Sequence, residues 1–168
     1  MFLTQEIARH VREVHFGENW TDSCLKDQLE DVDWLGATTQ VQALNSISSL
    51  AYHINYYIVA IIGVLQNKPL VAQDKESFNL PPISSQEDWN NLREKIWADA
   101  KKFAELIENF PEEKLFEDMP DKKYGSFYRN FQGIIEHFYY HLGQIANLKK
   151  GSFNFLVFYF FNGIACKA

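Results

Sequence analysis

The chain has 168 residues, 46% of them hydrophobic and 15% aromatic, which is enough for one domain with a sizeable core. The formal net charge is -6 and no run of Lys or Arg is longer than two, so a basic face for nucleic acid is excluded. Cys24 and Cys166 have neither disulfide-framework nor zinc-site spacing, and the N-terminus lacks the features of a secretory signal. We therefore expect a cytoplasmic protein with free thiols and with neither nucleic acid nor membrane as a partner.

The N-terminal part of the chain predicts two helices. Apolar residues spaced by about 3.6 residues mark an amphipathic helix over residues 2–14, and Gly17 ends it. A short extra helix is predicted over residues 25–32, with Thr21 or Asp22 as its cap.

A central helix and a long loop come next. Residues 33–36 are typical of a turn, and a second long helix is predicted from Asn45 or Ser46 to about Gln66. Its apolar stripe makes this helix central to the fold. The segment 67–82 is longer than most connections in compact domains, and we expect it to cover part of the molecule.

Two more long helices complete the pattern. Ser85 begins a third helix with a capping-box-like signal, and Pro111 ends it. Ser126 caps a fourth helix that runs through Leu148, and Lys149 and Lys150 suit its negative C-terminal end. The sequence therefore predicts an all-α fold, a four-helix bundle over residues 1–150 with one or more crossover connections.

The tail, residues 151–168, is apolar. Its uncharged run over residues 153–161 is too short to span a bilayer as a helix. The run has high β-propensity and would be sticky if exposed, so we expect the tail to pack on the bundle or on a partner subunit. Oligomerisation is the favoured interpretation.

Three histidines are candidate ligands for a metal. His137 and His141 stand four residues apart in an apolar helix, so both side chains project from one face. Burying two imidazoles without partners would cost a few kcal/mol each, and a metal would offset that cost. If His53 on the second long helix faces the same point, three imidazoles can hold one divalent metal with one position open. Hydrogen-bonded core histidines are the alternative.

The surroundings of the pair favour one metal over two. The glutamate precedes the histidine pair, so the H-E-x-x-H protease pattern is absent, and no Glu stands three residues before a His as in di-iron bundles. Gly133, one turn before His137, removes a side chain from the same row and could leave room for substrate or water. Close helix packing is the other explanation for this glycine. His10 and His15 are interpreted as structural.

The helix order and the histidine spacing resemble the DinB-like (YfiT-like) superfamily of metalloenzymes. The resemblance covers most of residues 1–150 and is carried by the segments 45–54 and 133–145, with a weaker likeness in 17–20. It implies that the three histidines form a site for zinc, nickel or another divalent ion, and that the protein is a homodimer. Relatives include thiol-dependent S-transferases and a mycothiol-dependent isomerase, and many others carry only a presumed hydrolase label. The tail departs from this pattern.

The sequence therefore predicts an enzyme with one divalent metal ion per chain, of the hydrolase or thiol S-transferase type, acting on a small molecule. A low-molecular-weight thiol would be the cosubstrate in the second case. The metal would lower the pKa of a bound water or thiol. Trp20, Tyr57 and Gln144 are candidates to line the pocket, and no residue is assigned as general base. The alternative is a non-catalytic metal-binding or scaffold bundle protein that acts through oligomerisation.

Overall fold

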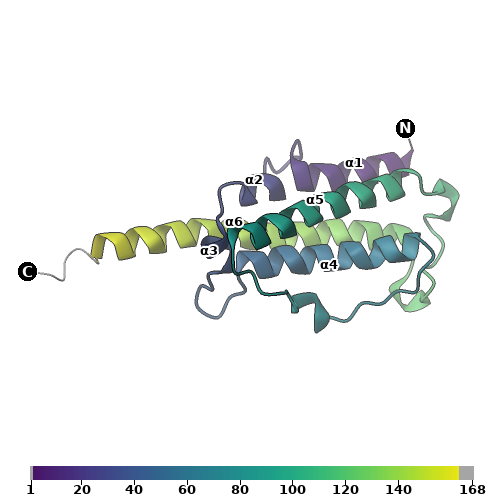
Figure 1. Cartoon of the computed structure of the whole chain (residues 1–168). Coiled ribbons are helices and arrows are strands. Elements are labelled where there is room, and N and C mark those ends of the chain that lie inside the picture. The colour runs from purple at the N-terminus through teal and green to yellow at the C-terminus, as the bar shows by residue number, and fades with distance from the viewer. Residues whose placement is uncertain (1, 163–168) are drawn as a thin grey trace, which may run out of the picture.

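The computed structural model describes the backbone of residues 2–162 and the side chains of residues 2–151. Four long helices pack side by side, and α1 and α4 each contact both α5 and α6, so that the four close a ring around one core (Figure 1). The described residues form no strand, so the all-α prediction is confirmed, whereas the DinB-like type of bundle stays a prediction. The long helices are α1 (Leu3–Phe16), α4 (Ile47–Leu65), α5 (Gln86–Glu108) and α6 (Phe127–Asn162).

Local signals set three of the helix ends as predicted. The side chain of Ser46 accepts a hydrogen bond from the backbone N–H of Ser49, and that of Ser85 accepts one from Asp88. Gly17 ends α1 with a φ of 114°, a value that L side chains rarely adopt. These contacts fix where the two helices with serine caps begin and where the first one ends.

The cap predicted for the short second helix is wrong. Cys24, rather than Thr21 or Asp22, occupies the N-cap position of α2 (Leu25–Leu29). The hydroxyl of Thr21 instead donates to the side-chain oxygen of Asn19, at 2.7 Å, and so belongs to the preceding loop.

The turn predicted at residues 33–36 is instead the start of another short helix, α3 (Trp34–Thr38). Asp33 explains the difference, because its carboxylate accepts from the backbone N–H of Gly36 at 2.7 Å and caps the helix. The same residue types favour turns and helix caps, so the sequence did not separate the two.

The core contains large aromatic side chains from α5 and α6. Trp89, Phe103, Phe131 and Phe138 are all almost fully buried. Helix α4 is the one helix in the described part of the chain that is long and apolar enough to cross a membrane, but 56% of that stretch is buried inside the protein. A core helix has the same length and composition, so this property alone carries no membrane assignment.

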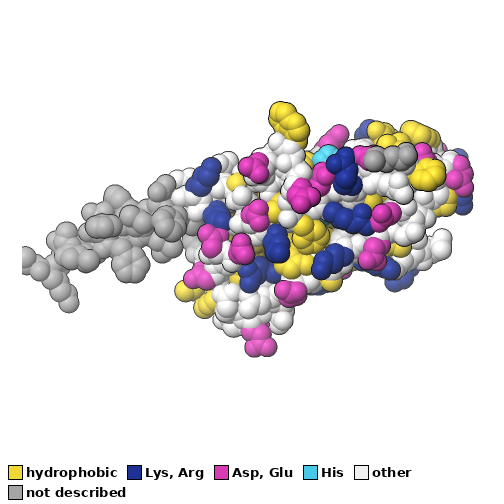
Figure 2. Space-filling view, turned by 90° about the horizontal axis from the view of Figure 1, so that it is seen from above, with side chains coloured by type: hydrophobic (Ala, Val, Ile, Leu, Met, Phe, Trp, Pro, Cys, Tyr) yellow, Lys and Arg dark blue, Asp and Glu magenta, His cyan; other side chains and the backbone are white. Residues whose placement is uncertain are grey.

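The outer faces of the helices carry ion pairs. Arg12 pairs with Glu108 across α1 and α5, and Lys95 pairs with Asp99 within α5. Figure 2 shows acidic and basic side chains intermixed on one face of the molecule. Exposed pairs of this kind contribute on the order of 0–1 kcal/mol each, so the stability of the fold rests on its core.

Helix α6 continues to Asn162, past the end predicted near Leu148, and Figure 1 shows its last part extending beyond the other helices. Lys149 was expected to stabilise a helix end, but it pairs with Asp31 and donates to the backbone oxygen of Asp27, which ties α6 to the segment at α2. Side chains beyond Gly151 lie outside the described residues, so the predicted packing of the tail stays a prediction.

The long connection between α4 and α5 covers α4, as expected. It contains a 3-10 helix, η1 (Glu76–Phe78), that packs on α4, and Ser77 is completely buried. Two tyrosines of α4 hold the connection in place. The hydroxyl of Tyr56 accepts from the backbone N–H of Gln73, and the hydroxyl of Tyr57 donates to the carboxylate of Asp74.

Candidate metal centre

The three predicted histidines meet inside the ring of helices. Helix α4 supplies His53, and α6 supplies His137 and His141 from one face. The Nε2 atom of His137 lies 3.1 Å from that of His53 and 2.9 Å from that of His141. One ligand nitrogen from each residue lies within 4.8 Å of the others, so the three are close enough to hold a metal ion.

The hydrogen bonds on the other side of two rings decide where their lone pairs point. Ser77 uses its own proton to donate to the backbone oxygen of Asp74, at 2.6 Å, so its hydroxyl oxygen accepts from His53 Nδ1, at 2.8 Å. Gln144 Oε1 can only accept, and it takes the proton of His141 Nδ1 at 2.7 Å. Both rings therefore carry their proton on Nδ1 and direct a lone pair from Nε2 toward His137.

A metal ion can satisfy these lone pairs better than hydrogen bonds among the three histidines can. A proton on His137 Nε2 could satisfy only one of the two neighbouring nitrogens, whereas a cation can accept all three. Nitrogen ligands of a tetrahedral zinc at about 2.0–2.1 Å lie roughly 3.3 Å apart. The observed nitrogen separations of 2.9 and 3.1 Å differ from this value by only a few tenths of an ångström.

The environment favours the neutral form of His53 and His137, which is the form that binds metals. Burial lowers the pKa of His53 to about 4, and repulsion from His141 and His137 acts in the same direction. Burial and His141 likewise lower the pKa of His137. The negative charge of Asp74 opposes both shifts.

Aromatic rings hold the histidines in position. Phe78 of the long connection stacks on His53 with ring centroids 4.1 Å apart. Tyr57 meets both His53 and His137 edge to face at 5.2 Å, and Tyr140 meets His141 in the same way at 4.9 Å. These contacts restrict rotation of the imidazole rings.

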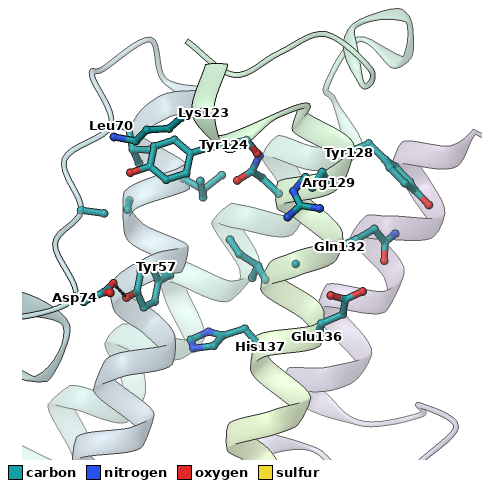
Figure 3. A pocket seen from close by; sticks show the side chains of 16 residues that line it. Tyr57, Leu70, Asp74, Lys123, Tyr124, Tyr128, Arg129, Gln132, Glu136 and His137 are labelled. Carbon is teal, nitrogen blue, oxygen red and sulfur yellow. Dashed lines mark hydrogen bonds between the residues drawn. The ribbon is translucent and has the colours of Figure 1, made fainter. Parts of the chain in front are cut away.

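A cavity of about 800 Å³ lies beside the cluster, between α4, α6 and the long connection (Figure 3). His137 lines it, whereas His53 and His141 are not among its lining residues. Gly133 also lines it, and a methyl group added there would meet no atom within 4 Å. Of the two explanations offered for Gly133, the structure supports the one in which the missing side chain leaves open space near His137. Close helix packing is excluded, because no neighbouring helix approaches this position.

The three predicted pocket residues have different outcomes. Tyr57 lines the cavity, and burial together with its hydrogen bond to Asp74 raises its pKa to about 12. Gln144 is not among the lining residues and instead orients His141.

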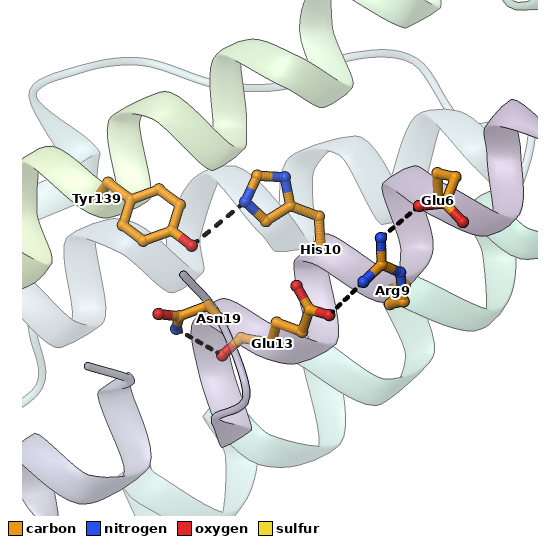
Figure 4. Close-up of polar contacts among 6 residues, drawn as sticks. All are labelled: Glu6, Arg9, His10, Glu13, Asn19 and Tyr139. Carbon is orange, nitrogen blue, oxygen red and sulfur yellow. Dashed lines mark hydrogen bonds and ion pairs between the residues drawn. The ribbon is translucent and has the colours of Figure 1, made fainter. Parts of the chain in front are cut away.

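The prediction for Trp20 is wrong, because this side chain is 100% exposed and lines a separate hollow beside α1. Its neighbour Asn19 donates to the backbone oxygen of Glu13 (Figure 4) and to that of Ser23, and these bonds hold the loop in which Trp20 is exposed.

The other two histidines have structural contacts, as predicted. His10 Nε2 lies 3.2 Å from the hydroxyl of Tyr139 and so links α1 to α6 (Figure 4). His15 is 1% exposed, and its Nδ1 donates to the backbone oxygen of Val11 at 2.6 Å.

Sequence reasoning missed several residues of the site. Ser77, Phe78 and Asp74 lie in the long connection, whose length was the only signal that it covers something. Arg129 and Glu136 line the cavity from α6. Arg129 stands eight residues before His137 and so lies on the same face of the helix, and Glu136 directly precedes His137 and lies beside that face. That periodicity could have identified them.

Comparison with protein-family models, with curated proteins and with solved structures found no match for this chain. The fold and the site therefore define it as an all-helical protein whose three-histidine group can hold one metal ion beside a large cavity.

Proposed function

We propose that the protein is a mononuclear metalloenzyme in which His53, His137 and His141 hold one divalent ion. The observation that carries this proposal is the convergence of their Nε2 atoms beside the cavity. Of the three histidines, His137 is the one that lines this cavity. A site of three protein ligands beside open space is the arrangement of catalytic metal sites, whereas structural sites are closed by a fourth protein ligand.

The ligand set favours particular metals. Three imidazoles suit zinc, nickel and similar ions, while calcium and magnesium prefer oxygen ligands. The positions of Ser77 and Gln144 match the partners that usually orient metal-bound histidines through the second ring nitrogen. A bound divalent ion would supply Lewis-acid chemistry and lower the pKa of a water or thiol.

Asp74 is the residue best placed to accept a proton from the nucleophile. Together with Glu136 it is one of the two carboxylates among the residues that line the cavity, and its charge acts on His53 and His137. Tyr57 donates to its Oδ1 at 2.6 Å and leaves Oδ2 for a second partner. We therefore assign proton transfer to Asp74 and its orientation to Tyr57.

Two reaction classes fit this arrangement. In hydrolysis, the oxygen of water bonds to the electrophilic centre, Asp74 takes the water proton, and the leaving group departs with its electron pair and later receives that proton. In thiol transfer, the sulfur of a small thiol bonds to an electrophilic carbon while the bond from that carbon to the leaving group breaks. Asp74 takes the thiol proton, and the leaving group departs with its electron pair and later receives that proton. The thiol cosubstrate, the homodimer and the cytoplasmic location stay predictions.

Metal analysis of the purified chain tests the proposal. We expect close to one divalent ion per chain in the wild type and its loss in His53→Ala and His137→Ala. His10→Ala is the matched control, because His10 contacts Tyr139 outside the site and its removal leaves the metal in place.

Absence of metal in the wild type, even after incubation with zinc or nickel, would overturn the proposal. The non-catalytic scaffold protein would then be favoured. Where metal is found, hydrolytic and thiol-transfer substrates are screened with the identified ion.

A further inference from the structure

The cavity beside the histidines carries charge of opposite sign at its two ends. Arg129 and Lys123 lie at the end near the start of α6, and His137 lies at the other end (Figure 3). The acidic groups that line the cavity are Asp74, which acts on the histidines, and Glu136, which is next to His137 in the chain. An elongated ligand therefore meets positive charge at one end only.

Arg129 is the cation at this end that has no ion-pair partner within the described part of the chain. Lys123 is engaged, since its ammonium group pairs with Asp121 at 2.9 Å and lies 4.7 Å from the centre of the Tyr124 ring. Among the described residues, the guanidinium of Arg129 has neither an ion-pair partner nor a side-chain hydrogen bond. A guanidinium presents five N–H donors in a planar fork that matches a carboxylate or a phosphate.

The register of α6 connects this cation to the histidine centre. Arg129, Gly133 and His137 are spaced by four residues, so they lie one above the other on one face of the helix. Eight residues of helix correspond to about 12 Å along the axis. The missing side chain of Gly133 leaves the space between the two ends open.

The walls between the two ends are largely apolar. Ile61 and Ala60 of α4 and Leu70 of the long connection face Ile134 of α6 across the cavity. Such walls bind a hydrocarbon segment and contribute roughly 25 cal/mol for each Å² of apolar surface buried.

We propose that the cavity binds an organic anion in which an apolar segment separates an acidic group from the reacting group. The acidic group pairs with Arg129, the apolar segment passes Gly133, and the reacting group lies at His137. The identity of this molecule as the substrate rests on the proposed function, but the pairing of an anion with Arg129 does not. The shared chemistry is that of a carboxylate or a phosphate at the end of an apolar chain.

Calorimetric titration of the purified chain with octanoate, octanol and octylammonium tests the pairing. We expect octanoate to bind more tightly than octanol and octylammonium to bind weakest. In Arg129→Gln the affinity for octanoate falls about tenfold and that for octanol is unchanged, as the loss of one charge-assisted pair at an accessible site predicts. Arg12→Gln is the matched control, because it removes an arginine that pairs with Glu108 away from the cavity.

Two further variants separate this inference from the metal proposal. His137→Ala abolishes metal binding but leaves the tenfold difference between wild type and Arg129→Gln for octanoate. Gly133→Leu fills the cavity and weakens all three probes, while circular dichroism and metal content stay as in the wild type. If octanoate affinity is lost in His137→Ala and unaffected in Arg129→Gln, the acidic group binds at the histidines and the inference is overturned.

Octyl phosphate, titrated in parallel, distinguishes the two acidic groups. Tighter binding of the phosphate than of octanoate, with the same dependence on Arg129, assigns the site to phosphate esters, and the reverse order assigns it to carboxylates. Equal binding of octanol and both anions would show that the cavity selects apolar chains alone and would contradict the proposed pairing.

Discussion

The Nδ1 atom of His53 lies 2.8 Å from the hydroxyl oxygen of Ser77, a residue 24 positions further along the chain. Because Ser77 donates its own proton to Asp74, it can only accept from His53, and the lone pair of this histidine is directed to the centre of the cluster. One buried serine of the long connection thus determines which nitrogen of His53 is available to a metal. This relationship links the position of a loop to the chemistry of the site.

Replacement of Ser77 by alanine tests this link. Without the hydroxyl, the buried Nδ1–H of His53 loses its acceptor and the ring loses the contact that fixes its orientation. We expect the affinity for zinc to fall by about 10- to 100-fold while the fold is retained. Competition with a chelator of known affinity measures the change.

Ser84→Ala is the control for this experiment, because Ser84 lies in the same connection but is exposed and only its backbone is hydrogen-bonded. The same zinc affinity for Ser77→Ala and wild type would show that the contacts of Phe78 and Tyr57 hold the ring without the serine.

The contrast between local and long-range contacts explains what the sequence could predict. Gly17, Ser46 and Ser85 act within four residues of themselves, so their helix ends could be predicted from short segments. The spacing of His137 and His141 is equally local. Ser77 meets His53 from a connection that also bonds to the tyrosines of α4, and no spacing rule in the sequence indicates that contact.

Two wrong predictions have related causes. Trp20, the last residue of the segment 17–20, was predicted to line the pocket, but its direction depends on the hydrogen bonds of Asn19. The end of α6 was placed near Leu148 because two lysines follow, yet Lys149 pairs with a residue more than a hundred positions earlier. Side-chain partners that are distant in sequence decide both cases.

Gln144 gives a second, independent test of how the histidines are oriented. Gln144→Leu keeps a side chain of similar size but removes the acceptor of His141 Nδ1, so we expect zinc affinity to fall by about 10- to 100-fold. Gln144→Glu keeps an acceptor and makes it charged, which favours the same ring orientation. We expect it to retain wild-type affinity or to bind zinc more tightly. Weaker binding by both variants to the same extent would contradict this role.

The role of Asp74 is tested with whichever reaction the substrate screen identifies. Asp74→Asn can still accept from Tyr57 but cannot take up a proton, so we expect kcat to fall by about 10²- to 10⁴-fold with metal content unchanged. Glu76→Gln in the same connection is the matched control and should retain activity. An unchanged kcat in Asp74→Asn would move the proton-accepting role to Glu136, the other carboxylate that lines the cavity.

His15 makes a prediction about stability that is independent of the metal. Its ring centroid lies 4.3 Å from that of Phe138, and among the described residues its Nε2 has no hydrogen-bond partner. Burial lowers the pKa of His15 to about 4 from an ordinary value of 6.5. The folded protein therefore keeps His15 neutral at pH values where the unfolded chain already binds a proton. Stability is fully present above pH 6.5 and is lost as the pH falls from 6.5 toward 4, by about 3 kcal/mol in total.

Urea unfolding of wild type and His15→Gln between pH 7 and pH 4 measures this contribution. Both proteins share every other titrating group, so those effects cancel in the difference between the two curves. We expect His15→Gln to be less stable at pH 7, because an amide replaces a well-packed ring, but to lose about 3 kcal/mol less on acidification. If the free energies of unfolding of the two proteins fall in parallel with pH, the folded protein accommodates a charged His15. The buried Nε2, which has no hydrogen-bond partner among the described residues, and the nearby ring of Phe138 argue against this outcome.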